Sequence, residues 1–247
     1  IIDYNFVSWQ PYCDDGIIKA TEVTPHQYPF AARAFIRSVG RPGICGEIFC
    51  GQCGVSVVNC CVHKGTTVPI DPADIRFNIG AHFDQTCSFS NLCCIYEGEH
   101  RSVTGTVVET NEIIVHPSYN KGLDWDFCLA KVEKMNIDGT TVKVVRFPDA
   151  HIAPSIVTVG EKSVARNQCL VMSWGETERG VQSATLLAAS VEIMSDSYCK
   201  TFPGKYSRMN PTFEFCAGKR HNPKSFYNED SCSGDSGGPL HGLFFEA

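Results

Sequence analysis

Short runs of apolar and β-branched residues, separated by turn residues, dominate the hydrophobic pattern of this chain. Little of the pattern follows the 3.6-residue period of an amphipathic helix, and the runs have the lengths and bounds typical of strands. The expected strands include Phe30–Ile36, Gly54–Val58, Ser102–Val108, Ile113–Val115, Thr141–Val145, Ile156–Val159 and Ala188–Ile193. Ser195 is the expected N-cap of one short helix. The pattern therefore predicts an all-β sandwich or barrel.

The chain has 247 residues, of which 43% are hydrophobic, so it can bury the core of one large domain or two small ones. A net charge of -6 without a run of Lys or Arg argues against nucleic acid as a partner. We expect no membrane span, because no stretch of about 18 apolar residues is uninterrupted. The first residues lack the layout of a secretory signal, which suggests that any signal has been removed.

Fourteen cysteines in a chain of this length indicate an oxidising compartment and a disulfide-bonded, secreted protein. A metal protein is the alternative, because Cys50-Gly51-Gln52-Cys53, Cys60-Cys61 and Cys93-Cys94 resemble pairs of ligands. Adjacent cysteines are awkward as two ligands of one zinc ion, however, and the CxxC pair is not repeated. We therefore expect disulfides, and neither a metal nor another cofactor.

One stretch carries most of the chemical information: Asp230-Ser231-Cys232-Ser233-Gly234-Asp235-Ser236-Gly237-Gly238-Pro239. It has the residues of a nucleophilic Ser236 in a tight glycine turn, where the amides of Gly234 and Ser236 can form an oxyanion hole. Asp235 is the carboxylate that could hold this loop by pairing with a buried cation. A plain surface turn is the alternative interpretation, but ten residues in this order rarely arise by chance.

On these residues the chain resembles the chymotrypsin/trypsin family of serine proteases. The resemblance runs from about Ile17 to Leu240, and it includes Thr24–Phe30, Val115–Asn120 and Ser173–Gly175. It implies two packed antiparallel six-stranded β-barrels. In the site it implies that Ser236 is the nucleophile, that Asp126 orients a histidine and that Asp230 selects Arg or Lys side chains. It also implies a Cys199–Cys216 disulfide beside the specificity pocket.

The catalytic histidine of the family directly precedes a cysteine that bridges to another cysteine 16 residues upstream. Cys45 and Cys61 have this spacing, so the resemblance implies a Cys45–Cys61 disulfide and places Cys60 where the histidine belongs. A thiol beside Asp126 makes a poor base, because the carboxylate raises its pKa and sulfur cannot relay hydrogen bonds in two directions. His63 is the alternative base, although an exposed loop histidine is the simpler interpretation.

The activation segment also departs from the family. In the family, cleavage creates a new N-terminus, and its free amine pairs with the aspartate before the serine. Here Ile17 follows Asp14-Asp15-Gly16, after which a trypsin-like activator would not cut. We therefore expect residues 1–16 to remain as a propeptide-like segment, so that Ile17 would not supply the amine for Asp235.

The end of the sequence departs as well, because the family continues for about fifty residues after the serine motif. We expect the homologue domain, 17–247, to be truncated and its second barrel to be incomplete, so that either a partner covers the gap or the sequence is cut short. In the family, a cysteine at the position of Gly242 would form a disulfide with Cys169, so the resemblance leaves Cys169 without its usual partner. Exposed strand edges and unpaired cysteines would favour association with other molecules.

These residues predict a secreted, catalytically inactive serine protease homologue that binds protein partners. The resemblance implies a decoy, cofactor or inhibitor in a proteolytic or innate-immune cascade. The rival hypothesis is an active trypsin-like serine endopeptidase that cleaves protein substrates after Arg or Lys, with Ser236, Asp126 and His63 as its triad. A misread gene product without a stable fold is the third hypothesis.

Overall fold

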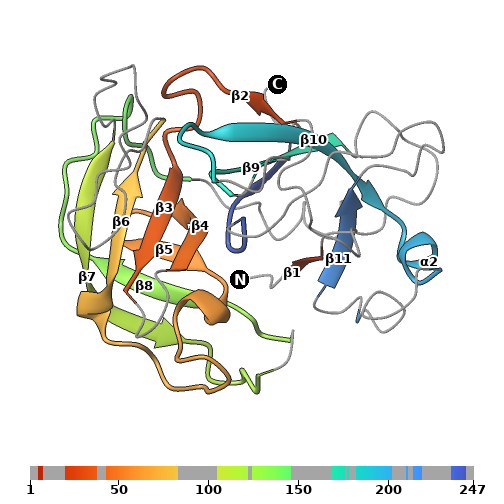
Figure 1. Ribbon diagram of the computed structural model, residues 1–247, viewed down its shortest axis with the longest axis horizontal. Coiled ribbons are helices and arrows are strands. Elements are labelled where there is room, and N and C mark those ends of the chain that lie inside the picture. The colour runs from red at the N-terminus through yellow and green to blue at the C-terminus, as the bar shows by residue number, and fades with distance from the viewer. Residues whose placement is uncertain are drawn as a thin grey trace.

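The computed structural model describes residues 5–7, 20–37, 43–82, 105–121, 124–145, 168–175, 177, 182–201, 210, 214–218 and 235–242. Within these ranges almost all regular structure is strand (Figure 1). The helical elements there are the 3₁₀ turns η1 (Val58–Cys60) and η2 (Pro72–Asp74) and the single-turn helix α2 (Asp196–Cys199). The all-β prediction is confirmed.

Six antiparallel strands form a closed barrel, which occupies the left half of Figure 1. In their order around the barrel they are β3 (Ala31–Ile36), β4 (Gly43–Phe49), β5 (Cys53–Ser56), β8 (Cys128–Val132), β7 (Thr106–Val115) and β6 (Ile75–Ile79). Alternate residues of each strand enter the core, where Ala32 and Ala34 meet Phe49 and Phe77. Closure leaves none of these six strands with an open edge.

A second sheet packs beside the barrel, with the strand order β1-β11-β10-β9-β12 and with β2 paired to β10. Its strands are β1 (Asn5–Val7), β2 (Thr21–Glu22), β9 (Gln168–Ser173), β10 (Leu187–Met194), β11 (Glu214–Gly218) and β12 (Leu240–Gly242). The pairing of β1 with β11 is parallel, whereas the other pairs are antiparallel. The predicted family fold is thus present as one closed barrel and a second sheet.

Three of the expected strands lie differently in the structure. Ser102–Val108 and Ile113–Val115 were expected to be separate, but β7 is one strand with an irregularity between Thr110 and Glu112. Thr141–Val145 is not a strand, because the Asp138 carboxylate accepts the backbone N–H groups of residues 140, 141 and 142 and holds a turn. Such side-chain capping competes with strand pairing.

The expected helix cap and three further expected strands are present in the structure. The Ser195 hydroxyl accepts the backbone N–H of Tyr198 at 3.3 Å, as an N-cap of α2 should. Phe30–Ile36, Gly54–Val58 and Ala188–Ile193 overlap β3, β5 and β10. The expected strand at Ile156–Val159 lies outside the described residues.

The barrel and the second sheet share a hydrophobic interface. Phe30 and Ala31 of the barrel pack in one cluster with Met172, Trp174 and Leu186 of the second unit. The backbone carbonyl of His82 accepts hydrogen bonds from the Trp174 indole at 3.3 Å and from the Leu186 amide at 2.8 Å. These contacts fix the two units against each other and so fix the residues that meet between them.

Candidate active site

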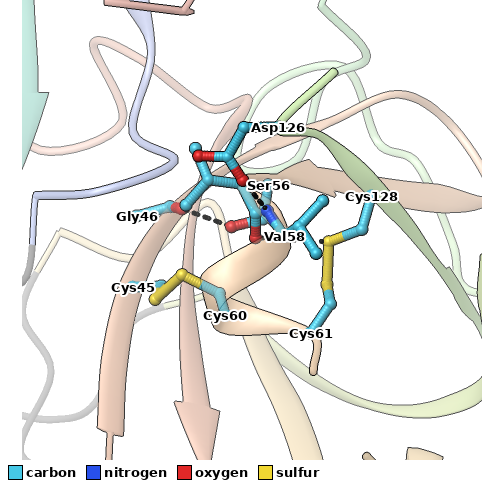
Figure 2. Close-up of a disulfide and its surroundings, with 9 residues drawn as sticks. Cys45, Gly46, Ser56, Val58, Cys60, Cys61, Asp126 and Cys128 are labelled. Carbon is cyan, nitrogen blue, oxygen red and sulfur yellow. Dashed lines mark hydrogen bonds between the residues drawn. A yellow bond between two sulfur atoms is a disulfide. The ribbon is translucent and has the colours of Figure 1, made fainter. Parts of the chain in front are cut away.

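Two disulfides fix η1, the turn that follows β5. Cys60 is bonded to Cys45 and Cys61 is bonded to Cys128, so the predicted Cys45–Cys61 disulfide is wrong. In a 3₁₀ turn successive side chains point about 120° apart, since the turn has three residues. Cys60 therefore enters the barrel core with Cys45, whereas Cys61 enters a separate cluster with Cys128 and Val58. Figure 2 shows the two bonds on opposite sides of the turn.

The corrected pairing also corrects the assignment of Cys60. Asn59, not Cys60, directly precedes the cysteine that is bonded to Cys45. Cys60 is 3% exposed and its sulfur is in a disulfide, so it has no thiol that could take a proton. Asn59 is exposed, and its amide side chain has no group that accepts a proton near neutral pH. Because Cys60 and Cys61 are adjacent, either of them could have been the partner of Cys45. The sequence alone did not decide between the two pairings.

Asp126 lies directly against this turn. Its side chain is buried, and Oδ1 accepts the backbone N–H of Val58 at 2.8 Å (Figure 2). The backbone N–H of Asn59 also donates to this carboxylate. Burial raises the pKa of Asp126, and the two N–H groups oppose this rise in part. Asp126 is therefore oriented by the same turn that carries Asn59.

Ser236 lies in a turn immediately before β12, and its side chain is exposed. Its backbone carbonyl accepts the Gly46 amide of β4 at 2.9 Å. The approach is close, because a Cβ on Gly46 would stand 2.6 Å from the Gly238 Cα. Gly237 has a φ of 81°, in the left-handed region that favours glycine. The glycines that the sequence motif supplies thus let the serine turn lie against the first barrel.

Asp235 ties the serine turn to the end of β9. Its Oδ1 accepts the backbone N–H of Gly175 at 3.0 Å, directly after Trp174, which is 1% exposed. The Gly238 amide donates to the Asp235 backbone carbonyl at 2.9 Å and closes the turn. The Ser173–Gly175 segment therefore positions the serine turn from the side of the second sheet.

Gly46 links the two parts of the site. It donates to Ser236, and its own carbonyl accepts the Ser56 hydroxyl at 3.3 Å, two residues before Val58 (Figure 2). Ser236 and Asp126 are thus brought to the same end of the barrel. In the described part of the chain, no histidine hydrogen-bonds to Asp126. The arrangement presents an exposed hydroxyl and a buried carboxylate, with an amide side chain on the turn next to the carboxylate.

His63, the alternative base, lies in a surface turn closed by the Val62–Pro69 bridge. Its side chain is exposed. Its backbone N–H donates to the Val68 carbonyl at 3.0 Å, and its carbonyl accepts the Thr66 amide at 2.9 Å. The backbone of His63 is therefore fixed by this turn.

The remaining predicted site residues are Asp230, Gly234 and Ile17, all of which lie outside the described residues. The expected Cys199–Cys216 disulfide is present and joins α2 to β11. The described residues contain no group of three or more His, Cys, Asp or Glu side chains placed to hold a metal ion. Each helix in the described ranges is too short or too polar to cross a membrane.

Cys169 is a free, buried thiol in β9, and burial raises its pKa to about 11. Its direct partner across the β9–β12 pair is Gly242. The structure therefore places opposite Cys169 the residue at which the sequence comparison expected a cysteine.

Comparison with known proteins gives consistent matches. A family model described as Trypsin matches residues 88–243, more than half of the chain. Trypsin of Saccharopolyspora erythraea is 28% identical over 199 residues, which cover 79% of this chain and 71% of that protein. Trypsin 5G1 of Aedes aegypti is 27% identical over 240 residues, which cover 94% of this chain and 73% of that protein.

Human Kallikrein-4 is 31% identical over 135 residues, which are 54% of this chain. This match spans only 46% of the length of the kallikrein. A solved structure, "Structure of GrC", superposes with a TM-score of 0.63 and covers 92% of this chain and 84% of that one. At 22% sequence identity, this likeness is one of fold.

Proposed function

This chain belongs to the trypsin family of serine proteases, and we propose that it is a secreted, non-catalytic member that acts by binding other proteins. The observation that carries the proposal is the position of Asn59. This residue directly precedes the cysteine bonded to Cys45, and its backbone N–H donates to Asp126. In this family a histidine precedes the bridging cysteine and is oriented by the aspartate.

Asparagine cannot replace that histidine in the chemistry. Attack by Ser236 needs a neighbouring group that takes the hydroxyl proton and later returns it to the leaving amine. An amide side chain donates and accepts hydrogen bonds but does not bind a proton at neutral pH. In subtilisin, removal of the histidine alone lowers kcat by roughly 10⁶, or about 8 kcal/mol of barrier. Only binding and oxyanion stabilisation would remain here.

The same site retains features that suit binding. Ser236 is exposed in a turn held by Gly46 on one side and by Gly175, through Asp235, on the other. Asp230, if it lies in a specificity pocket as in trypsin-like relatives, would attract an Arg or Lys side chain of a protein partner. We infer a role as decoy, cofactor or inhibitor in a proteolytic cascade, such as an innate-immune one.

The disulfides of this chain support the proposal that it is secreted. Four disulfides lie among the described residues, and such bonds persist in oxidising compartments. We infer that residues 17–247 form the protease-homologue domain and that residues 1–16 stay with it.

An active trypsin-like endopeptidase is the second candidate. The intact serine motif favours it, and several relatives are named trypsins. In that case His63 would have to supply the base from its surface turn. The two candidates differ in one property, the reactivity of the Ser236 hydroxyl.

An arginine-type phosphonate probe, which reacts only with an activated serine, separates the candidates. We expect no labelling of the natural chain and measurable labelling of Asn59→His, since Asp126 is already in place to orient an imidazole. Ser236→Ala in both backgrounds is the matched control. Stoichiometric labelling of the natural chain at the rate of trypsin would overturn the proposal. A folded Asn59→His variant that stays unlabelled would show that Asn59 is not the missing group.

A further inference from the structure

The turn between β4 and β5 carries a disulfide that differs from the others among the described residues. Cys50 and Cys53 are bonded to each other at a sequence separation of 3, and both residues are partly exposed. The cysteines of the other three described disulfides are all buried: Cys45, Cys60, Cys61, Cys128, Cys199 and Cys216. Of these four bonds, Cys50–Cys53 is therefore the one that a thiol in solution reaches while the protein stays folded. Exposed disulfides of this kind are the ones that exchange with other thiols.

The direction of the two side chains follows from the strands that flank the turn. Phe49, directly before Cys50, is in the barrel core. Gly54, directly after Cys53, also faces that core, because a Cβ there would stand 3.6 Å from the Phe77 side chain. Successive residues of a strand point to opposite faces, so Cys50 and Cys53 lie on the outer surface of the barrel.

Backbone hydrogen bonds hold this turn independently of its disulfide. The Cys50 N–H donates to the Cys53 carbonyl at 2.8 Å, and the Val132 N–H of β8 donates to the Gln52 carbonyl at 3.1 Å. The disulfide also closes a very short loop, so it removes less entropy from the unfolded chain than the bond from η1 to β8, whose separation is 67. Opening of the Cys50–Cys53 bond should therefore leave the barrel folded.

The two sulfur atoms differ in their surroundings. Lys131 of β8 is the direct partner of Cys53 across the β5–β8 pair, so the two side chains lie on one face of the sheet. A cation beside Cys53 favours its thiolate. The Cys50 sulfur instead lies 2.8 Å from the Cys53 carbonyl oxygen, which suits a protonated thiol and repels a thiolate. Cys53 is accordingly the better leaving group of the two.

We propose that Cys50–Cys53 is a thiol–disulfide exchange site whose reaction partner is a dithiol. A thiolate of the dithiol attacks the Cys50 sulfur, the bond between the two cysteines breaks, and Cys53 leaves as a thiolate beside Lys131. The second thiolate of the dithiol then attacks the dithiol's own sulfur in this mixed disulfide and releases Cys50. The dithiol ends as a disulfide, and its two electrons and two protons end on Cys50 and Cys53. The site is separate from Ser236 and does not depend on whether that serine is catalytic.

Reduction of the natural full chain under native conditions tests the site. The protein is mixed with dithiothreitol or with reduced thioredoxin, quenched with iodoacetamide at intervals and mapped by peptide mass spectrometry. We expect Cys50 and Cys53 to be alkylated at least about ten times faster than the six buried, bonded cysteines, while the circular dichroism spectrum stays unchanged. Reaction with both reagents would support protein dithiols as partners, and reaction with dithiothreitol alone would support small dithiols. Reduction of this bond no faster than the buried ones, or only with loss of the fold, would overturn the proposal.

Variants at the turn test the direction of attack. Cys50→Ser and Cys53→Ser each leave one thiol of the pair, and near neutral pH we expect Cys53 in the first to be alkylated faster than Cys50 in the second. Lys131→Met should slow reduction of the natural bond about two- to fivefold, because the leaving thiolate loses its cation. Lys64→Met, which removes an exposed lysine from the turn after η1, is the matched control and should leave the rate unchanged. Equal alkylation of the two single thiols, with an unchanged rate in Lys131→Met, would overturn the assignment of Cys53 as the leaving group.

Discussion

The two halves of the candidate site differ in how they are built. Asp126 and Asn59 belong to a closed barrel, where the Cys45–Cys60 and Cys61–Cys128 disulfides fix the turn between them. Ser236 belongs to a second sheet, where the described residues leave Cys169 unbonded opposite Gly242. Among the described residues the barrel has three disulfides and the second sheet has one, Cys199–Cys216, so the half with the serine motif is there the less braced half.

This difference bears on the cause of the proposed loss of activity. The turn around Asn59 retains its disulfide, its 3₁₀ geometry and a carboxylate that accepts its backbone amides. Because the backbone around Asn59 is held by these contacts, a different side chain at this position changes the chemistry of the site but not the shape of its backbone. On our proposal, a single side chain at position 59 accounts for the loss of catalysis while the backbone of the site is kept.

Gly242→Cys should have the largest effect, because it would supply the second sheet with a bridge. Gly242 and Cys169 are direct partners in an antiparallel pair, where Cα separations of about 4.5–5.5 Å suit a disulfide. Closing this long loop should stabilise the protein by up to about 4 kcal/mol. Denaturant unfolding under oxidising and reducing conditions measures the gain.

Gly242→Ala is the control for that variant, since it adds a side chain without a thiol. A folded Gly242→Cys protein that retains two free thiols would contradict the register between β9 and β12. A gain that persists under reducing conditions would show that the added side chain, and not the bridge, is responsible.

Asp126→Ala should have the next largest effect and should contrast with Ser236→Ala. Removal of the carboxylate leaves the Val58 N–H, now paired at 2.8 Å, without its charged acceptor and costs about 2–3 kcal/mol. Ser236 is exposed, so Ser236→Ala should stay within about 0.5 kcal/mol. Chemical denaturation of both variants measures the loss in the free energy of unfolding. Similar losses for the two variants would contradict the prediction. Asp126→Asn, which keeps an acceptor oxygen, should lie between them.

Glu47→Gln should have the smallest effect, visible as a change in pH dependence. Glu47 is 1% exposed in the barrel, and burial raises its pKa well above the ordinary 4.5, while a hydrogen bond from Ser56 lowers it in part. Below pH 4.5 the carboxyl is protonated in both states. As the pH rises, the unfolded chain releases the proton first, so the barrel loses stability until the folded pKa is passed.

We therefore expect Glu47→Gln to gain stability relative to the natural chain as the pH rises above 4.5, until the raised pKa of the folded carboxyl is passed. Melting temperatures across this range measure the gain. Cys169→Ala is the control in the second sheet. The pKa of that thiol is raised from 9.0 to about 11, so its removal should change the pH dependence only above pH 9. A constant difference between Glu47→Gln and the natural chain at all pH values would contradict the prediction.

The fold was largely predictable because its strands have short apolar runs bounded by turn residues, as in Phe30–Ile36 and Ala188–Ile193. The serine turn was predictable because its geometry requires glycine at Gly237, which has a positive φ, and at Gly238, where a Cβ would stand 2.9 Å from the Asp235 carbonyl oxygen. The turn at Thr141–Val145 was missed, because the capping by Asp138 depends on side-chain geometry that a hydrophobic pattern does not contain.

The base position was misplaced by one residue for a different reason. Cys60 and Cys61 are adjacent and both paired, and only the direction of each side chain in η1 distinguishes their partners. Strand β1 was missed because three residues are too few for a periodic pattern. Its pairing also depends on β11, whose paired residues lie 209 positions further along the chain.

The most direct measurement of the central claim is the hydrolysis of an arginyl peptide substrate by the natural chain and by Ser236→Ala. We predict that both proteins give the same rate, at the level of the uncatalysed background, because no imidazole takes the proton of Ser236. Turnover by the natural chain at the speed of an ordinary trypsin, abolished in Ser236→Ala, would contradict this account.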